Sequence, residues 1–254
     1  MKCILADYCS LYKSNSCNNY CSSYIAVHGS NGKGGRSFAT NLPNEYRFIT
    51  VKNSPVRESQ SKVYESIDAY IQTFKRQFDL TEVKDVKSKI KSLYLYSNEP
   101  GTGKTTTASA VMNAWLVRHF IGSLQNGLLP LQTAAYFLDL NELQTLYNEF
   151  NRSNIPRETA EKSAKEYYRR MSNAKTAPFA VLDDIGVRSA TEAFRGDLHA
   201  VINHRVTNGL PTVYTSNIPI DELESVFDRR LYDRVRDLCV VLPFEGESKR
   251  GMRK

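Results

Sequence analysis

The chain has 254 residues, of which 24% are charged and 41% are hydrophobic, as expected for one globular domain with room for a small appendage. No apolar run approaches the roughly 18 residues of a membrane helix, and the first residues are too polar for a signal peptide. We therefore expect a cytoplasmic protein without a membrane partner. The formal net charge of +7 favours a polyanionic partner, although many basic proteins are merely soluble.

Four of the five cysteines lie close to the N-terminus, at Cys3, Cys9, Cys17 and Cys21. In a reducing compartment such a cluster is more often a metal site than a set of disulfides. Four thiolates satisfy tetrahedral Zn²⁺, and a segment this short lacks a hydrophobic core of its own. We interpret residues 1–45 as a zinc-binding head and linker. A segment with unligated thiols, packed or loose, is the alternative.

Residues 46–254 form the second predicted domain, in which strands and helices alternate. An amphipathic helix is predicted over 61–78 from the helical spacing of its apolar residues. The predicted strands are 92–97, 134–140, 178–183, 211–216 and 239–243, and the predicted helices between and after them are 104–121, 141–150, 156–173, 191–207 and 220–237. This alternation predicts a mostly parallel sheet covered on both faces, with a ligand site at the carboxyl ends of its strands.

The first strand of this core runs into a glycine-rich loop and then a helix, which is the setting of a nucleotide phosphate-binding loop. The loop comprises Asn98, Glu99, Pro100, Gly101, Thr102, Gly103, Lys104, Thr105 and Thr106. The two glycines let backbone N–H groups turn towards phosphate oxygens. Lys104 can reach the β- and γ-phosphates of ATP, and the Thr105 hydroxyl can ligate Mg²⁺. Asn98 stands where the pattern has its first glycine, and Asn tolerates positive φ better than other residues.

Two carboxylates, Asp183 and Asp184, follow the apolar strand over 178–183. Hydrolysis of ATP needs one carboxylate to hold Mg²⁺ and another to orient or deprotonate the attacking water. We assign the first role to Asp183 and the second to Asp184. Asn217 ends the next predicted strand, where its side chain can hydrogen-bond the γ-phosphate or the attacking water.

Arg230 and Arg234 lie four residues apart in a predicted helix and therefore share one face. An arginine supplied by a neighbouring subunit can neutralise charge on a transferring phosphoryl group. We interpret one of the two as acting in trans and prefer Arg234. A solvated, salt-bridged helix is the alternative.

The segment over 152–175 carries seven basic residues against three acidic ones, with Tyr167 and Tyr168 interleaved. Basic and aromatic side chains together suit single-stranded DNA, because they neutralise its backbone and stack on its bases. The alternative is a solvated helix with buried tyrosines. The last six residues, 249–254, add four positive charges that would contribute only nonspecific attraction.

The phosphate loop, the run Leu182-Asp183-Asp184-Ile185-Gly186, the run Tyr214-Thr215-Ser216-Asn217 and the arginine pair together resemble the DnaC/DnaI helicase-loader family of AAA+ ATPases, including phage-encoded versions. The resemblance covers residues from about 60 to 245. It implies an α/β P-loop NTPase (AAA+) fold: an αβα parallel-sheet core without a C-terminal lid, here with a small Cys-rich N-terminal segment.

The same resemblance implies an ATPase that uses Mg²⁺ and self-assembles with ATP. Such a protein binds single-stranded DNA and delivers a hexameric replicative helicase when DNA replication initiates. The N-terminal segment of this family contacts the helicase and in some members binds zinc. A phage-encoded member would act in the host cytoplasm.

Two other functions remain compatible with these motifs. A transposition-helper ATPase of the IstB type would act on double-stranded DNA and a transposase. A nucleotide-gated DNA-binding scaffold with little turnover is conceivable because Asp184 is one methylene shorter than Glu. The Cys-rich head favours the loader over the transposition helper.

Overall fold

A computed structural model describes residues 2–79, 90–186 and 190–248. Contacts divide the chain into two compact units. The first unit contains residues 1–90 and 105–136, and the second contains residues 91–104 and 137–254. The chain thus enters the second unit for one strand and the phosphate loop, returns to the first, and then completes the second.

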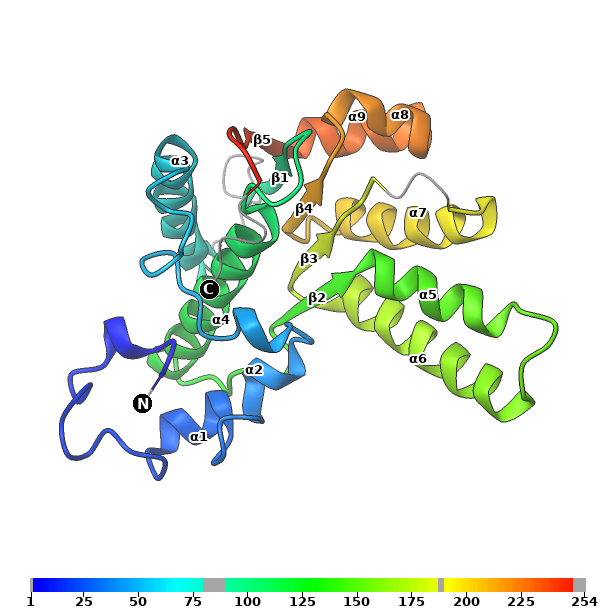
Figure 1. The fold of residues 1–254 in the computed structure, drawn as a ribbon. Coiled ribbons are helices and arrows are strands. Elements are labelled where there is room, and N and C mark those ends of the chain that lie inside the picture. Colours follow the sequence, from blue (N-terminus) through cyan, green and yellow to red (C-terminus); the bar gives the residue numbers. More distant parts are fainter. Residues whose placement is uncertain (1, 80–89, 187–189, 249–254) are drawn as a thin grey trace. The chain divides into compact units, whose positions relative to one another are not determined.

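The second unit is centred on a five-stranded sheet in the order β2-β3-β4-β1-β5 (Figure 1). Its strands are β1 (Ser92–Tyr96), β2 (Ala135–Asp139), β3 (Phe179–Asp183), β4 (Thr212–Ser216) and β5 (Cys239–Pro243). β1 pairs in parallel with β4 and β5, and β3 pairs in parallel with β4. The predicted strands are confirmed to within one residue at each end. β1 to β4 are short and almost fully buried, which is typical of parallel strands covered on both faces.

The described residues of the second unit include five α-helices. They are α5 (Leu140–Phe150), α6 (Arg157–Thr176), α7 (Glu192–Thr207), α8 (Leu223–Val226) and α9 (Arg229–Leu238), with a 3₁₀-helix, η5 (Ile220–Glu222), before α8. α5 and α6 pack together as a hairpin (Figure 1). The prediction of a single helix over 220–237 is wrong, because α8 ends at Val226 and a separate helix, α9, begins after Asp228. The Asp228 carboxylate accepts a hydrogen bond from Leu231 N (2.8 Å) and so begins α9 as its N-cap.

Arg205 is a fully buried cation that fixes α6 and α7 to the start of β4. Its guanidinium donates to the carbonyls of Ala174, Ala177 and Pro211, and to the Thr212 hydroxyl at 2.8 Å. Burial lowers the pKa of Arg205 to about 10, so the group stays charged at neutral pH. These bonds satisfy carbonyls at a helix end and a strand start, which would otherwise be buried without donors.

The first unit is built around α4 (Lys104–Gln125), which belongs to this unit from Thr105 to its end. Its other elements are α1 (Ser22–His28), α2 (Gly35–Ala39), α3 (Ser61–Gln72) and the 3₁₀-helices η1 (Ala6–Tyr8), η2 (Asn44–Tyr46) and η3 (Thr73–Phe78). The predicted end of α4 before Gly122 is wrong. Gly122 lies inside the helix, where a Cβ would come 2.2 Å from a ring carbon of Phe78, so this glycine permits close packing.

None of the helices within the described ranges is long and apolar enough to cross a bilayer.

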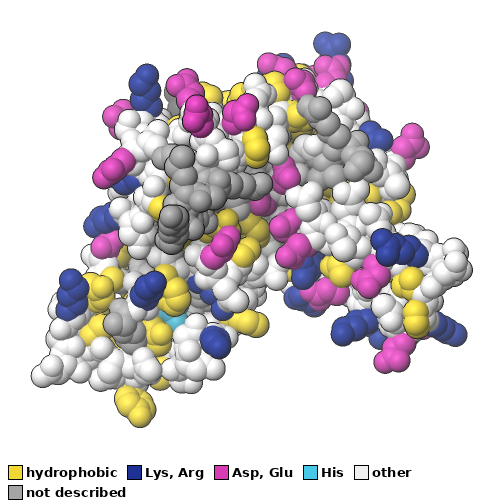
Figure 2. Space-filling view, in the orientation of Figure 1, with side chains coloured by type: hydrophobic (Ala, Val, Ile, Leu, Met, Phe, Trp, Pro, Cys, Tyr) yellow, Lys and Arg dark blue, Asp and Glu magenta, His cyan; other side chains and the backbone are white. Residues whose placement is uncertain are grey.

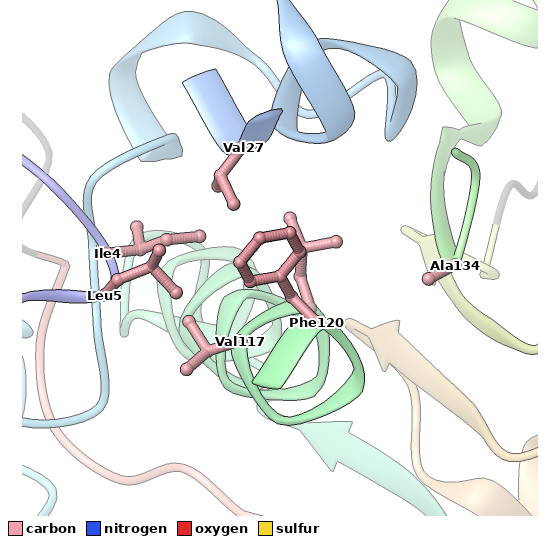
Figure 3. Close-up of a cluster of buried hydrophobic side chains, with 7 residues drawn as sticks. Ile4, Leu5, Val27, Val117, Phe120 and Ala134 are labelled. Atoms are coloured by element: carbon pink, nitrogen blue, oxygen red, sulfur yellow. The ribbon is translucent and has the colours of Figure 1, made fainter. Parts of the chain in front are cut away.

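The N-terminal head packs on α4 through a buried apolar cluster (Figure 3). This cluster comprises Ile4, Leu5, Val27, Leu116, Val117, Phe120 and Ala134. The segment after α1 is ordered as well, since the Arg36 guanidinium donates to the carbonyls of Ala26, Pro130 and Leu131. The domain boundary after residue 45 stays a prediction.

The stability of the protein should fall as the pH drops from about 6.5 to about 4, because the first unit buries His28 as a neutral ring. Burial lowers the pKa of His28 to about 4, and its Nε2 accepts a hydrogen bond from Ile4 N (3.3 Å). The unfolded chain therefore takes up the proton first, at its ordinary pKa of 6.5. The stabilisation is complete above that pH and is lost as the pH falls towards 4, at a cost of up to about 3 kcal/mol.

Melting temperatures between pH 7 and 4.5 measure this effect. His28→Gln removes the titrating ring, so its melting temperature should depend less on pH than that of the wild type. Equal pH slopes for the two proteins would contradict the assignment.

Candidate functional site

The strand register brings three of the predicted motifs to one edge of the sheet. Tyr96 of β1 pairs with Ser216 of β4, and Leu182 of β3 pairs with Tyr214 of β4. The phosphate loop, the carboxylate pair and Asn217 each follow one of these strands directly. Since parallel strands end at the same edge, polar side chains from separate parts of the chain meet there.

The phosphate loop has the backbone that its glycines predict. Gly101 and Gly103 have φ of 79° and 103°, which side chains other than glycine adopt with strain. Lys104 is almost fully buried, and its Nζ donates to the carbonyls of Ser97 (3.3 Å) and Glu99 (3.1 Å). The loop therefore holds the lysine ammonium against its own backbone.

Asn98 does not need the positive φ that we predicted for it. The non-glycine residues with positive φ among the described residues are Lys13, Asn41 and Asp184. The turn after β1 is held instead by Glu99 N, which donates to the Ser97 hydroxyl at 3.2 Å. An asparagine at position 98 is therefore accommodated without left-handed backbone.

Asp183 is buried at the end of β3 and is oriented by Thr215. The Thr215 hydroxyl donates to Asp183 Oδ1 (2.7 Å) and accepts from Asp184 N (2.9 Å). One hydroxyl on β4 thus fixes both members of the carboxylate pair. Thr215 belongs to the motif that ends in Asn217, although its sequence gave no separate reason to assign it this role.

Asp184 is held in the left-handed region, with φ of 63°. Such a conformation costs on the order of 1 kcal/mol for a non-glycine residue. Its carboxylate accepts from the side-chain amides of Asn217 (Oδ1, 3.1 Å) and Asn141 (Oδ2, 2.9 Å). Two amides from two different elements therefore aim a partly exposed carboxylate from the edge of the sheet.

Asn141 is a site residue that the sequence reasoning missed. It lies in the first turn of α5, directly after β2, and Asp139 caps that helix by accepting from Asn141 N (2.8 Å). A polar side chain just beyond a core strand was the signal that identified Asn217. The same signal, applied to β2, would have found Asn141.

Arg230 and Arg234 lie on α9, away from this hydrogen-bonded group. Arg230 is exposed, and Arg234 is partly buried against α7. In the described part of the chain, no hydrogen bond or ion pair joins either arginine to Asp183, Asp184 or Asn217. The structure thus brings the loop, the carboxylates and Asn217 to one edge but does not bring the arginines into contact with them.

The basic segment is largely α6, where several of its charges are already paired. Glu166 accepts from Arg169 and Arg170, and Glu161 accepts from Arg157. The hydrogen bond from Arg169, with that from Arg170, lowers the pKa of Glu166 to about 2. Figure 2 shows the resulting mixture of basic and acidic side chains over the α5–α6 hairpin, at the lower right.

The two tyrosines of α6 differ. Tyr167 is buried, and its hydroxyl donates to Asp197 of α7 at 2.7 Å, so it belongs to the core. Tyr168 is 61% exposed and is available for stacking. Lys162 and Lys165, which lie on the same exposed side of α6, form no ion pair with any described residue.

The four N-terminal cysteines are free thiols. Burial raises the pKa of Cys3, and the charges of Cys17, Cys21 and Cys9 raise it further, so the thiols influence one another electrostatically. No three His, Cys, Asp or Glu side chains within the described ranges are nevertheless close enough to hold a metal ion. The geometry of the described residues therefore does not support the predicted Zn²⁺ site.

Metal analysis of the purified protein decides the zinc prediction. Bound zinc would amount to about one equivalent per subunit and would be lost in the Cys17→Ser/Cys21→Ser variant. Cys239→Ser, outside the cluster, is the matched control and should change nothing. A wild-type protein free of zinc would leave the head as an ordinary packed segment of the first unit.

Comparison with known proteins gives one match in sequence and several in fold. No protein-family model matches the chain. The chain is 33% identical over 94 residues to the replicative helicase loader DnaI of Bacillus subtilis (strain 168). That match covers 32% of this chain and 30% of DnaI, so it spans less than a third of that protein.

Three solved structures share the fold over most of the chain. A structure described as a primosome component of Streptococcus pyogenes serotype M3 has a TM-score of 0.53 and 23% identity, covering 85% of this chain and 97% of that one. The DnaC helicase loader has a TM-score of 0.52 and 17% identity, with 80% and 100% covered. The replication initiator DnaA bound to AMPPCP and single-stranded DNA has a TM-score of 0.51 and 16% identity, with 81% and 51% covered.

These matches establish the fold class. The chain has the parallel-sheet α/β fold that DnaC and DnaA share, in agreement with the predicted fold class. In sequence it is similar to DnaI, and in fold to DnaC, which confirms the resemblance to the DnaC/DnaI type.

Proposed function

We propose that this chain, similar to DnaI in sequence and to DnaC in fold, is an ATP-dependent helicase loader that acts when DNA replication initiates. One observation carries the proposal. A nucleotide-type phosphate loop and an aspartate held by two amides meet at one sheet edge, in a chain with a loader-like sequence. Such a protein would work in the cytoplasm, where it would self-assemble, bind single-stranded DNA and deliver a hexameric helicase.

The edge of the sheet supplies groups suited to ATP and Mg²⁺. The backbone of the loop has positive φ at two glycines, and the loop residue Lys104 is a buried cation. Both features fit a site for a polyphosphate. Asp183 is a buried carboxylate fixed by Thr215, which fits a group that holds Mg²⁺ through its water shell. Bound Mg²⁺ and ATP would supply the electrophilic phosphoryl group and neutralise its charge. The role of Thr105 as a Mg²⁺ ligand stays a prediction from the sequence.

Asp184 is the group that we assign to the attacking water. Its carboxylate is partly exposed, and the amides of Asn141 and Asn217 fix its orientation. Asn217 is thereby both a partner of the base and a donor at the γ-phosphate position. Arg230 or Arg234 would complete the site of the next subunit in an assembly, because neither contacts these groups within its own subunit.

Binding of single-stranded DNA should depend on Lys162 and Lys165. These unpaired lysines lie with Tyr168 on the exposed side of α6, whereas the neighbouring arginines are largely neutralised by Glu166. Lys162→Glu/Lys165→Glu should weaken binding at least about tenfold and reduce the log–log salt slope by about 1 to 2. Fluorescence anisotropy with a labelled oligonucleotide at several salt concentrations measures both.

A charge-matched variant controls for the loss of positive charge. Lys62→Glu/Lys75→Glu makes the same change at two exposed positions of the first unit and should retain at least half of the DNA affinity. Equal loss in both variants would show that only net charge matters and would overturn the assignment to α6.

Co-purification with the cognate replicative helicase, with and without ATP, tests the proposed function. A loader should bind the helicase directly and form a complex of defined stoichiometry. An IstB-type helper should not bind the helicase and should instead bind double-stranded DNA together with its transposase. A chain that binds single-stranded DNA in a nucleotide-dependent way, ignores the helicase and shows no turnover would be the scaffold.

A further inference from the structure

A pocket of about 310 Å³ lies between α7 and α9 of the second unit, two helices that are neighbours in Figure 1. It is lined by His199, Asn203 and Thr207 of α7 and by Arg230, Leu231 and Arg234 of α9. No carboxylate lines it, whereas two guanidinium groups do. The pocket is therefore suited to an anion, and its volume exceeds that of a single phosphate group several-fold.

The contacts within the pocket treat the two arginines differently. An Arg234 guanidinium nitrogen donates to Asn203 Oδ1, which ties the side chain to α7. Arg230 is exposed and makes no hydrogen bond or ion pair with the described parts of the chain. Neither guanidinium therefore has a carboxylate to neutralise it.

A second contact fixes α9 against α7. His199 Nε2 lies 3.1 Å from Asp228 Oδ2, and Asp228 is the residue that caps α9. Two residues of α7, one turn apart, thus set the position of α9. His199 contacts the N-cap residue Asp228, and Asn203 accepts from Arg234. This leaves little freedom in where the Arg234 guanidinium lies.

The chemistry of Asn203 explains how a cation is held but kept available. A carboxylate at this position would orient Arg234 equally well, yet its charge would compete with any incoming anion. A neutral carbonyl oxygen accepts one N–H and leaves the full positive charge for an outside ligand. Arg170 shows the opposite arrangement, because Glu166 and Glu142 neutralise it.

We infer that Asn203 is a positioning residue, which holds Arg234 charged and oriented so that Arg234 and Arg230 together receive the terminal phosphate of a nucleotide bound to a second copy of this chain. The inference rests on the proposed function, in which these arginines act in trans. It adds that α7, through Asn203, forms half of the receiving surface. Arg230 is the exposed contact of the pair, and Arg234 is the one held by α7.

Two substitutions at one position separate positioning from mere structural support. Asn203→Asp keeps an acceptor for Arg234 but neutralises it, and Asn203→Ala removes the acceptor. ATP turnover on single-stranded DNA, followed against subunit concentration, should fall on the order of tenfold or more in Asn203→Asp and less in Asn203→Ala. ATP affinity of the isolated subunit should stay unchanged, because the phosphate loop is intact. A structural role for Asn203 predicts the reverse order, with Asp restoring wild-type turnover.

Asn208→Ala is the matched control, since Asn208 is an exposed asparagine at the end of α7 that does not line the pocket and donates to the His204 carbonyl, and it should keep near-wild-type turnover. Melting temperatures confirm that each variant folds. Wild-type turnover in Asn203→Asp, beside strong impairment in Arg234→Ala, would overturn this inference and leave the proposed function standing. Wild-type turnover in Arg230→Ala/Arg234→Ala would instead refute the trans-acting role on which it rests.

Discussion

Asp184→Asn should leave ATP binding intact and reduce ATP hydrolysis by about 10²- to 10⁴-fold. The substitution removes the negative charge of the carboxylate that we assign to the attacking water. It also disturbs the local hydrogen bonds, because both partners of Asp184, the amides of Asn141 and Asn217, are donors. An asparagine offers one acceptor oxygen, so one of these amides would meet another N–H donor. The phosphate loop lies in a separate segment and keeps its geometry.

Phosphate release and nucleotide affinity must be measured on the same protein. Asp221→Asn is the matched control, because Asp221 is an exposed carboxylate that accepts a hydrogen bond from the Tyr232 hydroxyl, and it should behave as wild type. Residual hydrolysis above a tenth of the wild-type rate in Asp184→Asn would contradict the role of Asp184. A parallel loss of ATP affinity would mean that the carboxylate binds nucleotide rather than water.

Lys104→Ala should weaken ATP binding by about 10- to 100-fold and abolish nucleotide-dependent assembly. The Lys104 ammonium donates to the carbonyls of Ser97 and Glu99, at 3.3 and 3.1 Å. Bound phosphates would offer it stronger, charged acceptors, so the lysine exchanges weak bonds for strong ones on binding. Removal of the ammonium therefore costs affinity, and assembly that depends on ATP fails with it.

Equilibrium binding of a fluorescent ATP analogue and sedimentation velocity with and without ATP measure the two effects. Lys33→Ala removes an exposed lysine of the first unit and should change neither. The melting temperature without nucleotide shows whether the loop itself survives in Lys104→Ala. Unchanged assembly with ATP in that variant would refute the site assignment.

Much of the second unit could be predicted because its strands are apolar runs that end in chemistry-bearing residues. The strand boundaries are confirmed to within one residue, since β1, β2 and β3 are largely apolar runs and a polar residue lies at or just after the end of each. The same reasoning predicts that Asp183, Asp184 and Asn217 share one edge of the sheet. The strand register confirms this placement, while their roles in hydrolysis stay predictions. The sequence reasoning misses Asn141 as a site residue, because it assigns Asn141 to the start of the helix predicted over 141–150.

Other features depend on tertiary contacts that no local pattern reveals. Gly122 is a helix end by local rules but is required within α4 by the ring of Phe78, which is 44 positions earlier in the chain. The break at Asp228 interrupts a run of helix formers because its carboxylate caps α9 and meets His199. Positive φ occurs at Asp184 rather than at Asn98, since the Thr215 hydroxyl accepts from Asp184 N and two amides donate to the Asp184 carboxylate.

The charge of α6 shows a further limit of composition. Seven basic residues against three acidic ones predict a strongly positive segment, yet Glu166 alone accepts from two of the arginines. Which cations stay available depends on helical spacing and on Glu142 from α5, which also pairs with Arg170. The DNA-binding prediction is therefore narrower than the sequence suggested, and it rests on Lys162 and Lys165.

Transfer of the cognate replicative helicase onto closed circular single-stranded DNA tests the central claim most directly. The account predicts that helicase bound to the circles rises with this protein and ATP, and that Lys104→Ala and the Lys162→Glu/Lys165→Glu variant fail to support it. A closed circle excludes threading from an end, so loading requires the helicase ring to be opened or assembled on the DNA. Helicase loading that is equal with and without this protein would contradict the account.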